Sequence, residues 1–169
     1  MSKVVAGTGH RPDKLGGFNP ATDQKTLIIA RKAIEVMQPS KVISGMALGW
    51  DTCLALAALE KSIPLIAAVP LRGFDSKWLR ESREAYQDIL DCADEIVYVD
   101  EVAGYGIQGV AAGVYHVGKL QKRNEWMVDN CDVIAALWNR TSGGTKNCID
   151  YAIKKRRMYQ NFWGEFVFL

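Results

Sequence analysis

The chain has 169 residues, of which 49% are hydrophobic and 24% charged, and its formal net charge is +2 at pH 7. These values are ordinary for one globular domain, which we expect to span residues 1–169. The net charge is too small for a broad basic surface, so nucleic acid is not expected as a partner. Neither an apolar run of membrane-spanning length nor a signal peptide is recognisable, so we expect a cytoplasmic protein that does not bind membranes.

The four cysteines are far apart in the sequence and form no CxxC pair; they are Cys53, Cys92, Cys131 and Cys148. Each lies in an apolar or helical context. In a reducing compartment this pattern favours buried free thiols over disulfides or a zinc site. We therefore expect no metal and no cofactor.

Short apolar segments alternate with segments of helical periodicity along the chain. In the first half we expect strands at residues 3–8, 41–43 and 64–69 and helices at about 23–37 and 52–61. In the second half we expect a helix that is capped by Ser76, carries Leu79 on its inner face and ends at Cys92. After it come a strand at 95–99, a helix at 119–130, a strand at 132–138 and a helix at 146–157.

Two segments fall outside this alternation. Residues 100–118 carry five glycines, and the interpretations that stay open for them are a lid or ligand-binding loop or, alternatively, a poorly ordered surface loop or an extra short helix at 110–113. The tail, 158–169, is too apolar to be free in water. It is expected to pack on the body, as a last strand, or on a second subunit.

Apolar strands that alternate with helices predict an α/β protein with a mostly parallel sheet of five or more strands and helices on both faces. In such sheets ligands bind beyond the carboxyl ends of the strands, near the point where the strand order reverses. The loops expected at those ends are 7–13, 44–51, 70–78, 104–118 and 140–145.

Two glycine-containing turns, 44–51 and 142–145, each lead from a strand into a helix. Free backbone N–H groups and the helix dipole at such a turn favour a phosphate, and glycine lets the ligand approach the backbone. Tight turns also take glycine for backbone reasons alone, but two of them together predict an anion site. The candidate contacts are Ser44, Gly45, Met46, Gly49, Asp51, Ser142, Gly143, Gly144, Thr145 and Asn147.

Other polar residues are expected near the same edge of the sheet. Gly9, His10 and Arg11 follow the first strand, where they contact a phosphate or ribose or, alternatively, form a solvated loop in which Arg11 pairs with Asp13. Arg123 is a phosphate clamp or an exposed helix cation.

Two further alternatives concern a carboxylate and the tryptophans. Asp51 is a helix cap or an acceptor for ribose hydroxyls. Trp50, Trp78 and Trp126 stack on a base or, more commonly for large aromatics, belong to the core.

Four segments in chain order resemble the SLOG superfamily, which includes the LOG phosphoribohydrolases, the DNA-processing protein DprA and uncharacterised YpsA-like proteins. They are Gly7-Thr8-Gly9-His10-Arg11-Pro12, the turn Ser44–Asp51, Arg123-Asn124-Glu125-Trp126-Met127-Val128, and Ser142-Gly143-Gly144-Thr145. The chain looks most like the short YpsA-like branch of bacteria and phages. The resemblance implies a single Rossmann-like domain, a nucleotide-type ligand and a homo-oligomer.

LOG enzymes cleave the N-glycosidic bond of nucleoside monophosphates with a PGGxGTxxE motif and an arginine on the preceding helix. Arg123 matches that arginine. Lys146, Asn147 and Cys148 stand where the acidic residues of the motif fall, and an asparagine cannot replace a catalytic carboxylate. If the protein is an enzyme, Arg123 and Asp150 are its candidate catalytic residues.

The sequence thus supports three hypotheses. In the first, the protein senses or sequesters a phosphorylated nucleotide or a nucleotide-derived signal that resembles NAD, ADP-ribose or a cyclic nucleotide. In the second, it is a nucleoside 5′-monophosphate N-glycosidase. In the third, it binds single-stranded DNA as DprA does, which the basic run 154–157 favours and the small net charge disfavours.

Overall fold

The computed structural model describes residues 2–169 and contains one six-stranded sheet whose neighbouring strands are all parallel. The strands are β1 (Val4–Gly9), β2 (Lys41–Ser44), β3 (Leu65–Val69), β4 (Glu95–Tyr98), β5 (Val133–Leu137) and β6 (Met158–Asn161). Their order is β4-β3-β2-β1-β5-β6. The chain builds outward from β1 in one direction and then returns to add β5 and β6 on the other side, so the strand order reverses between β1 and β5.

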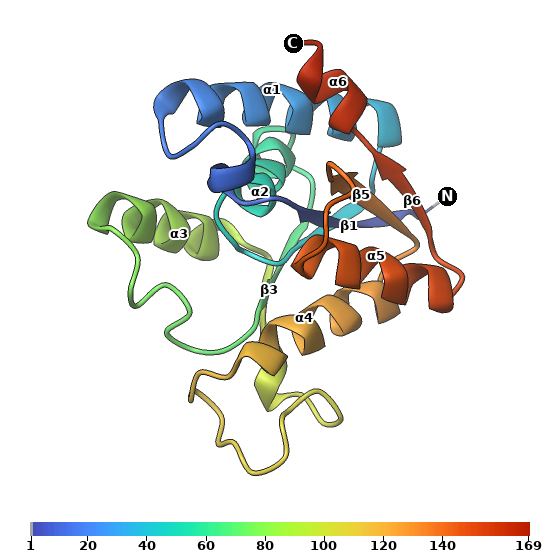
Figure 1. The fold of residues 1–169 in the computed structure, drawn as a ribbon. Coiled ribbons are helices and arrows are strands. Elements are labelled where there is room, and N and C mark those ends of the chain that lie inside the picture. The colour runs from blue at the N-terminus through green and yellow to red at the C-terminus, as the bar shows by residue number, and fades with distance from the viewer. Residues whose placement is uncertain (1) are drawn as a thin grey trace.

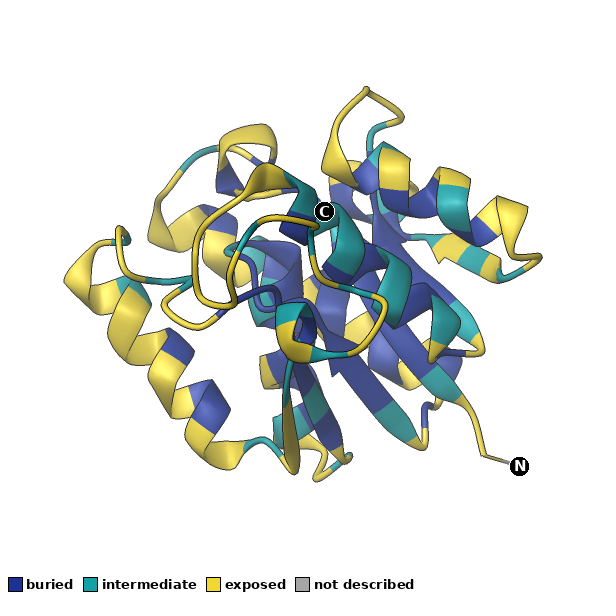
Figure 2. Cartoon of the chain, turned by 90° about the horizontal axis from the view of Figure 1, so that it is seen from below, coloured by how far each residue is buried: buried dark blue, intermediate teal, exposed yellow. Residues whose placement is uncertain are grey.

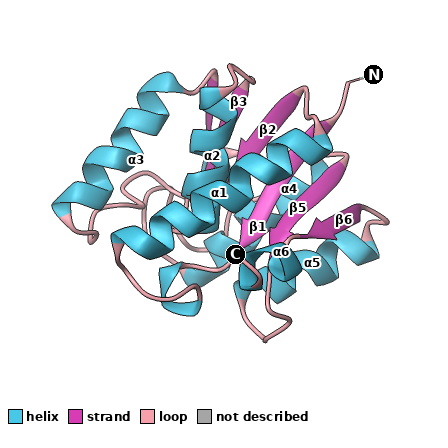
Figure 3. Ribbon diagram, turned by 90° about the horizontal axis from the view of Figure 1, so that it is seen from above, coloured by secondary structure: helices cyan, strands magenta, loops and turns pink. Residues whose placement is uncertain are grey.

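Helices cover both faces of the sheet (Figures 1 and 3). They are α1 (Pro20–Met37), α2 (Trp50–Glu60), α3 (Arg80–Cys92), α4 (Val117–Asp129), α5 (Gly144–Lys154) and α6 (Trp163–Val167), with short 3-10 helices η1 (Pro12–Lys14) and η2 (Val99–Glu101). Apolar residues of α1, α2, α3 and α6 share one core, and those of α4 and α5 share the other. This is the predicted Rossmann-like α/β fold.

Alternation along the strands explains why two cores form. In β5, Ala135 and Leu137 belong to the α1–α2 core, whereas Ile134 and Ala136 belong to the α4–α5 core. Both faces are buried, so the central strands are mostly apolar and carry no polar, solvent-facing row (Figure 2). The loops at the strand ends are therefore left to carry polar chemistry.

The predicted elements occur in the predicted order, but the start of α3 was wrong. Ser76 caps no helix, because Trp78 N–H donates to Asp75 O at 2.9 Å and keeps this segment in turns. The helix begins at Arg80 after Leu79, whose 78% exposure excludes it from the inner face. Cys92, at the end of the same helix, is exposed, whereas the other three cysteines are buried as expected.

The glycine-rich segment after β4 is a surface loop fixed by a buried ion pair. Asp100 and Lys119 have side chains only 1% exposed, and their charged groups lie 2.9 Å apart. Asp100 Oδ2 also accepts from Gly113 N–H at 2.9 Å, and Lys119 Nζ donates to Ala111 O at 2.8 Å. Within residues 2–169 the short helix considered for 110–113 does not form.

The tail forms β6, the last strand beside β5, followed by α6. Phe162 and Phe166 enter the α1–α2 core, which explains much of the apolar character of the tail. Residues 167–169 stay exposed, and oligomerisation through them remains a prediction. No helix within residues 2–169 is long and apolar enough to cross a membrane.

Candidate functional site

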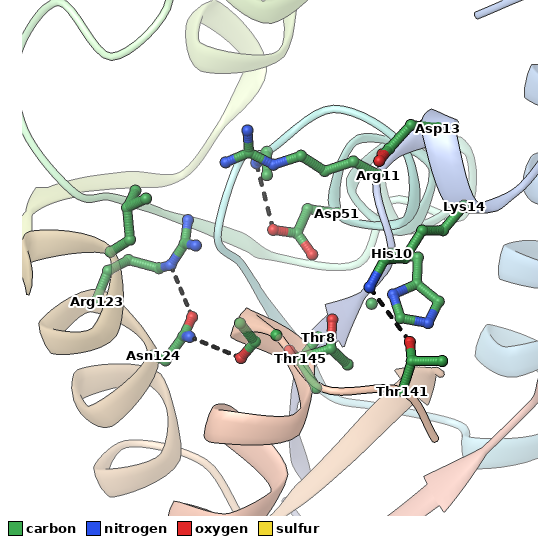
Figure 4. A pocket seen from close by; sticks show the side chains of 15 residues that line it. Thr8, His10, Arg11, Asp13, Lys14, Asp51, Arg123, Asn124, Thr141 and Thr145 are labelled. Carbon is green, nitrogen blue, oxygen red and sulfur yellow. Dashed lines mark hydrogen bonds between the residues drawn. The ribbon is translucent and has the colours of Figure 1, made fainter. Parts of the chain in front are cut away.

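A cavity of about 220 Å³ opens where β1 and β5 end, at the reversal of the strand order (Figure 4). It is the place where a parallel sheet of this kind is expected to hold a ligand. The first turn of α5, the loop after β1, the helix α4 and the loop after β2 all contribute to it. The residues that line it are Thr8, Gly9, His10, Arg11, Asp13, Lys14, Ala47, Asp51, Leu120, Arg123, Asn124, Thr141, Gly143, Gly144 and Thr145.

The N-terminus of α5 forms one wall of the cavity with unused backbone donors. Within the described residues, the N–H groups of Gly144 and Thr145 have no hydrogen-bond partner. Gly143, the N-cap, has φ 142°, a conformation that side chains disfavour. A Cβ at Gly144 would meet no atom within 4 Å. This wall is therefore open and presents the positive end of a helix dipole to the cavity.

Cationic side chains surround this wall. Lys14, at the end of η1, places Nζ 3.2 Å from both Thr141 Oγ1 and Ser142 O, so the ammonium group lies at the turn that precedes α5 (Figure 4). Arg11 also lines the cavity and forms no ion pair with Asp13 in the part of the chain described. Both cations come from the segment after β1, and Lys14 is the one that contacts the turn before α5.

Arg123 reaches the cavity from α4 and is 6% exposed. Its Nε donates to Asn124 Oδ1 at 3.0 Å, and its Nη1 donates to Gly45 O. Asn124 Nδ2 in turn lies 3.4 Å from Gly144 O. Burial lowers the pKa of Arg123, while the charge of Asp51 acts in the opposite direction. Arg123 and Asn124 thus connect the turn after β2 to the start of α5. Glu125 takes no part in this connection and pairs with Lys122, their charged atoms being 3.8 Å apart.

Asp51 is the buried carboxyl group of the cavity, with 5% exposure. Its Oδ2 accepts from Ala47 N–H at 3.3 Å, but its Oδ1 is buried without a partner. Burial raises the pKa of Asp51, and the charge of Arg123 opposes that shift. Buried polar atoms are nearly always hydrogen-bonded, so this oxygen at the cavity wall is available to accept a further hydrogen bond.

In the turn after β2, the backbone N–H groups of Met46, Ala47 and Trp50 are paired with protein atoms. Ser44 Oγ accepts from Met46 N–H at 3.2 Å and donates to Asp51 O at 2.8 Å, and Trp50 N–H donates to His10 O at 3.2 Å. A Cβ at Gly45 would lie 2.8 Å from both Arg123 Nη1 and Asp51 Oδ2. The glycine there is needed because protein atoms, rather than a ligand, fill the space.

His10 lines the cavity, but its ring has partners in the protein. Its Nε2 lies 3.0 Å from Asn139 N–H and 2.6 Å from Asn139 Oδ1, and its ring packs edge-to-face on Trp163 at 5.9 Å. Burial is the main cause that lowers the pKa of His10. The hydrogen bond with the Asn139 side chain acts on this pKa in the opposite direction, and the contacts with Asn139 hold the loops after β1 and β5 together.

The structure brings about half of the predicted site residues to the cavity. Gly9, His10, Arg11, Asp51, Arg123, Gly143, Gly144 and Thr145 line it, whereas Ser44, Gly45, Met46, Gly49, Ser142, Asn147 and Asp150 do not. Asn147 is exposed, and Asp150 is an exposed partner of Lys146 at 2.6 Å. Of the three tryptophans considered, Trp50 is fully buried, and Trp78 and Trp126 pack against the cores.

Seven lining residues were not named as candidate contacts. Thr8, Asp13, Ala47 and Thr141 lie in loops that were predicted for the ligand edge of the sheet, whereas Lys14, Leu120 and Asn124 lie outside those loops. Asn124 lies next to Arg123 in a segment already singled out, so its amide was a detectable signal. Lys14 gave none, because only the path of the loop after β1 brings it to the start of α5.

No family model matches the chain, but a curated relative does. The chain is 33% identical over 144 residues to YoqJ, an uncharacterised SPbeta prophage-derived protein of Bacillus subtilis. The match covers 82% of this chain and 84% of that protein. A UPF0398 protein of Halalkalibacterium halodurans is 24% identical over 170 residues, covering 95% and 85%. The chain belongs to the YpsA-like (UPF0398) family.

Solved structures agree with the SLOG-type fold of this YpsA-like protein. DprA of Streptococcus pneumoniae has a TM-score of 0.64 at 16% identity; the match covers 95% of this chain and half, 50%, of that one. DprA of Helicobacter pylori, whose structure concerns its single-stranded DNA binding mode, has a TM-score of 0.62 at 19% identity, with 94% and 64% covered. The molybdenum cofactor carrier protein of Chlamydomonas reinhardtii gives 0.57 at 12% identity, with 95% and 76% covered. At such identities these likenesses concern the fold alone.

Proposed function

We propose that this protein binds a phosphorylated nucleotide or nucleotide-derived signal in the cavity between β1 and β5, as a sensor or sequestering protein. The phosphate binds the free N–H groups of Gly144 and Thr145 and the charges of Lys14 and Arg11. Asp51 Oδ1 accepts a ribose hydroxyl. The unpaired Oδ1 and the open helix N-terminus, which line the same cavity, carry the proposal, because together they suit a ligand that has both an anion and a hydrogen-bond donor.

The experiment compares two glycines that tolerate a side chain equally well. A Cβ at Gly144 or at Gly164 would meet no atom within 4 Å, and neither has a positive φ. Gly144→Val fills the phosphate position, whereas Gly164→Val lies in α6, away from the cavity. We expect mononucleotides, ADP-ribose or NAD to raise the melting temperature of the wild type and of Gly164→Val but not of Gly144→Val.

The result that contradicts the proposal is a ligand-induced shift in Gly144→Val equal to that of the wild type. Isothermal titration of the same three proteins with ribose 5-phosphate then tests the phosphate and ribose contacts without a base. A phosphate bound at a helix N-terminus with a lysine is worth several kcal/mol of charge-assisted hydrogen bonding, so its loss lowers affinity more than about tenfold.

N-glycosidic hydrolysis is a second candidate, and one observation favours it. Asp51 is a buried carboxyl with a raised pKa that lies beside Arg123 in the same cavity. A proton held by a carboxyl at this place suits general acid catalysis of base departure. Asp150 is exposed, paired with Lys146 and outside the cavity, so we assign it no part in this candidate.

The test of hydrolysis is the release of free base from nucleoside 5′-monophosphates, followed by chromatography. Activity that is lost in Asp51→Asn and kept in Asp150→Asn supports this candidate. Absence of any released base in the wild type leaves binding without cleavage as the function.

Single-stranded DNA binding has the support of one comparison, since the DprA structure of H. pylori concerns that activity. The prediction that nucleic acid is not a partner is therefore not supported. The basic run 154–157 lies at the C-terminal end of α5, opposite the helix terminus that lines the cavity. A gel shift that depends on salt and on Lys154 and Lys155 but not on Gly144 would indicate a separate DNA surface.

A further inference from the structure

A second, larger cavity adjoins the first. It has a volume of about 510 Å³ and lies between the loop after β3 and the loop fixed by Asp100 and Lys119. Arg11 and Leu120 line both cavities. Across the same boundary, the Arg123 guanidinium lies 6.0 Å from the centre of the Phe74 ring. A ligand that fills the first cavity can therefore extend into the second past Arg11.

The lining of the second cavity combines aromatic rings with cations. Phe74 and Trp78 pack edge-to-face at 5.2 Å, and Tyr115 contributes a ring that is 65% exposed. The cations are Arg11, Lys77 and Arg72, of which Arg72 pairs with Glu101 at 2.9 Å, and no carboxylate is among the lining residues. Rings and cations without acidic groups suit a planar π system attached to a phosphate.

The walls of this cavity are held in place. Trp78 also packs edge-to-face on Tyr86, a buried residue of α3, at 5.3 Å. On the opposite side, the buried Asp100 carboxylate accepts from Gly113 N–H, and Gly113 and Tyr115 both line the cavity. Tyr105 OH donates to Asp129 Oδ2 at 2.6 Å and fixes the start of the same loop. The Phe74–Trp78 pair is thus positioned before a ligand arrives, and the backbone close to Tyr115 is anchored at Gly113.

We propose that the second cavity is the base-binding subsite, in which Tyr115 and the Phe74–Trp78 pair stack on the base of the nucleotide. This inference rests on the proposed function, because it places the base of the ligand whose phosphate lies at the start of α5. Arg11 spans the two subsites and contacts the part of the ligand between base and phosphate. The subsite explains the role of the glycine-rich loop: it carries one wall of the base site.

The experiment separates the base from the phosphate with two probes, ribose 5-phosphate and a 5′-mononucleotide with the same sugar and phosphate. Tyr115→Ala removes the exposed ring, and Phe18→Ala is its matched control, because Phe18 is 68% exposed and lines neither cavity. Titration calorimetry gives both affinities for each protein. Purine and pyrimidine mononucleotides are both used, since stacking accepts any base.

We expect the wild type and Phe18→Ala to bind a mononucleotide at least about tenfold more tightly than ribose 5-phosphate. Tyr115→Ala is expected to lose roughly fivefold or more of the mononucleotide affinity, in the range measured for base stacking, and none of the ribose 5-phosphate affinity. Stacking on Trp78 is expected to make a mononucleotide quench the tryptophan emission of the wild type. Trp78→Phe keeps an aromatic ring in the cavity, so we expect it to retain mononucleotide binding and to lose that quenching.

Equal binding of the two probes by the wild type overturns the base subsite and leaves the phosphate site standing. Equal losses for both probes in Tyr115→Ala also overturn it. If neither probe binds the wild type, the proposed function itself fails and the subsite with it. Binding of a single-stranded oligonucleotide that needs Tyr115, without binding of mononucleotides, assigns the cavity to nucleic acid and overturns the inference.

Discussion

The two glycine-containing turns, 44–51 after β2 and 142–145 after β5, look alike in sequence but differ in what fills the space beside their glycines. Gly45 is crowded, with an added Cβ 2.8 Å from Arg123 and Asp51, whereas Gly144 faces open space. The first turn pairs Met46 N–H with Ser44 Oγ and Ala47 N–H with Asp51 Oδ2. The second leaves the N–H groups of Gly144 and Thr145 without a partner in residues 2–169.

This difference shows that glycine in a strand-to-helix turn can have two separate structural purposes. After β2 it lets the side chains of Arg123 and Asp51 approach the backbone, so the turn serves as a support that holds charged groups at the cavity. After β5 it leaves room for a ligand. Both turns line one cavity, and our proposal assigns the phosphate to the second.

The largest expected effect is on stability, at Gly45. Gly45→Val places a branched side chain against buried charged groups, so we expect a loss of about 1–3 kcal/mol or more in the free energy of unfolding. For a chain of this size that corresponds to a fall of roughly 2–12 °C in melting temperature. Gly144→Val, measured in the same way without ligand, is expected to stay within about 0.5 kcal/mol of the wild type. Equal losses in the two variants would remove the distinction between the turns.

The next effect is on affinity, at Lys14, which belongs to the open turn. Lys14→Met removes the ammonium group beside Ser142 O but keeps most of the aliphatic side chain. We expect ribose 5-phosphate to bind about tenfold more weakly, with a smaller dependence on salt. Lys32→Met is the control, since Lys32 is exposed on α1 and lies outside the cavity. The assignment of the phosphate is wrong if both variants bind with wild-type affinity.

The smallest effect is on the pH dependence of stability, at Asp51 in the closed turn. Burial raises the folded-state pKa of Asp51 above the unfolded value of about 3.9. The Asp51 carboxyl of the folded protein therefore keeps its proton to higher pH than the same group in the unfolded chain. The free energy of unfolding that this carboxyl contributes is fully present below about pH 4 and is lost as the pH rises through the folded-state pKa.

The side chain in Asp51→Asn cannot ionise, so the stability of this variant does not show that decline with rising pH. We expect its melting temperature, measured without ligand, to rise relative to the wild type between about pH 4 and pH 7. Asp150→Asn, at an exposed ion pair, is expected to show no such divergence. Parallel profiles for the wild type and Asp51→Asn would show that the charge of Arg123 offsets burial and that the pKa of Asp51 is not raised.

Much of the fold was predictable because it depends on local periodicity. Apolar strands and helical stripes gave the order of elements, and the alternation gave the parallel sheet. The start of α3 was wrong because a chain of turns at Asp75–Trp78 competes with a Ser76 cap, and turn geometry leaves little trace in composition. The exposure of Cys92 likewise depends on which side of α3 meets the sheet.

The candidate site was less predictable, because it depends on contacts between distant segments. Arg123 was identified from its motif, but its bond to Gly45 O joins residues 78 positions apart. Asp150 looked like the nearest carboxylate in sequence, yet it faces away, while Asp51 comes to the cavity through β2. Spacing along one helix does not reveal which carboxylate the neighbouring strands bring close.

The sequence by itself determined the α/β class, the YpsA-like resemblance and the edge of the sheet where a ligand is expected, since hydrophobic periodicity and short motifs are local properties. The tertiary structure alone decided that the two glycine turns have different roles. Packing places Arg123 and Asp51 against Gly45 and leaves Gly144 facing a cavity, and these distances follow from how α4, β2 and α5 meet, which no stretch of sequence encodes alone.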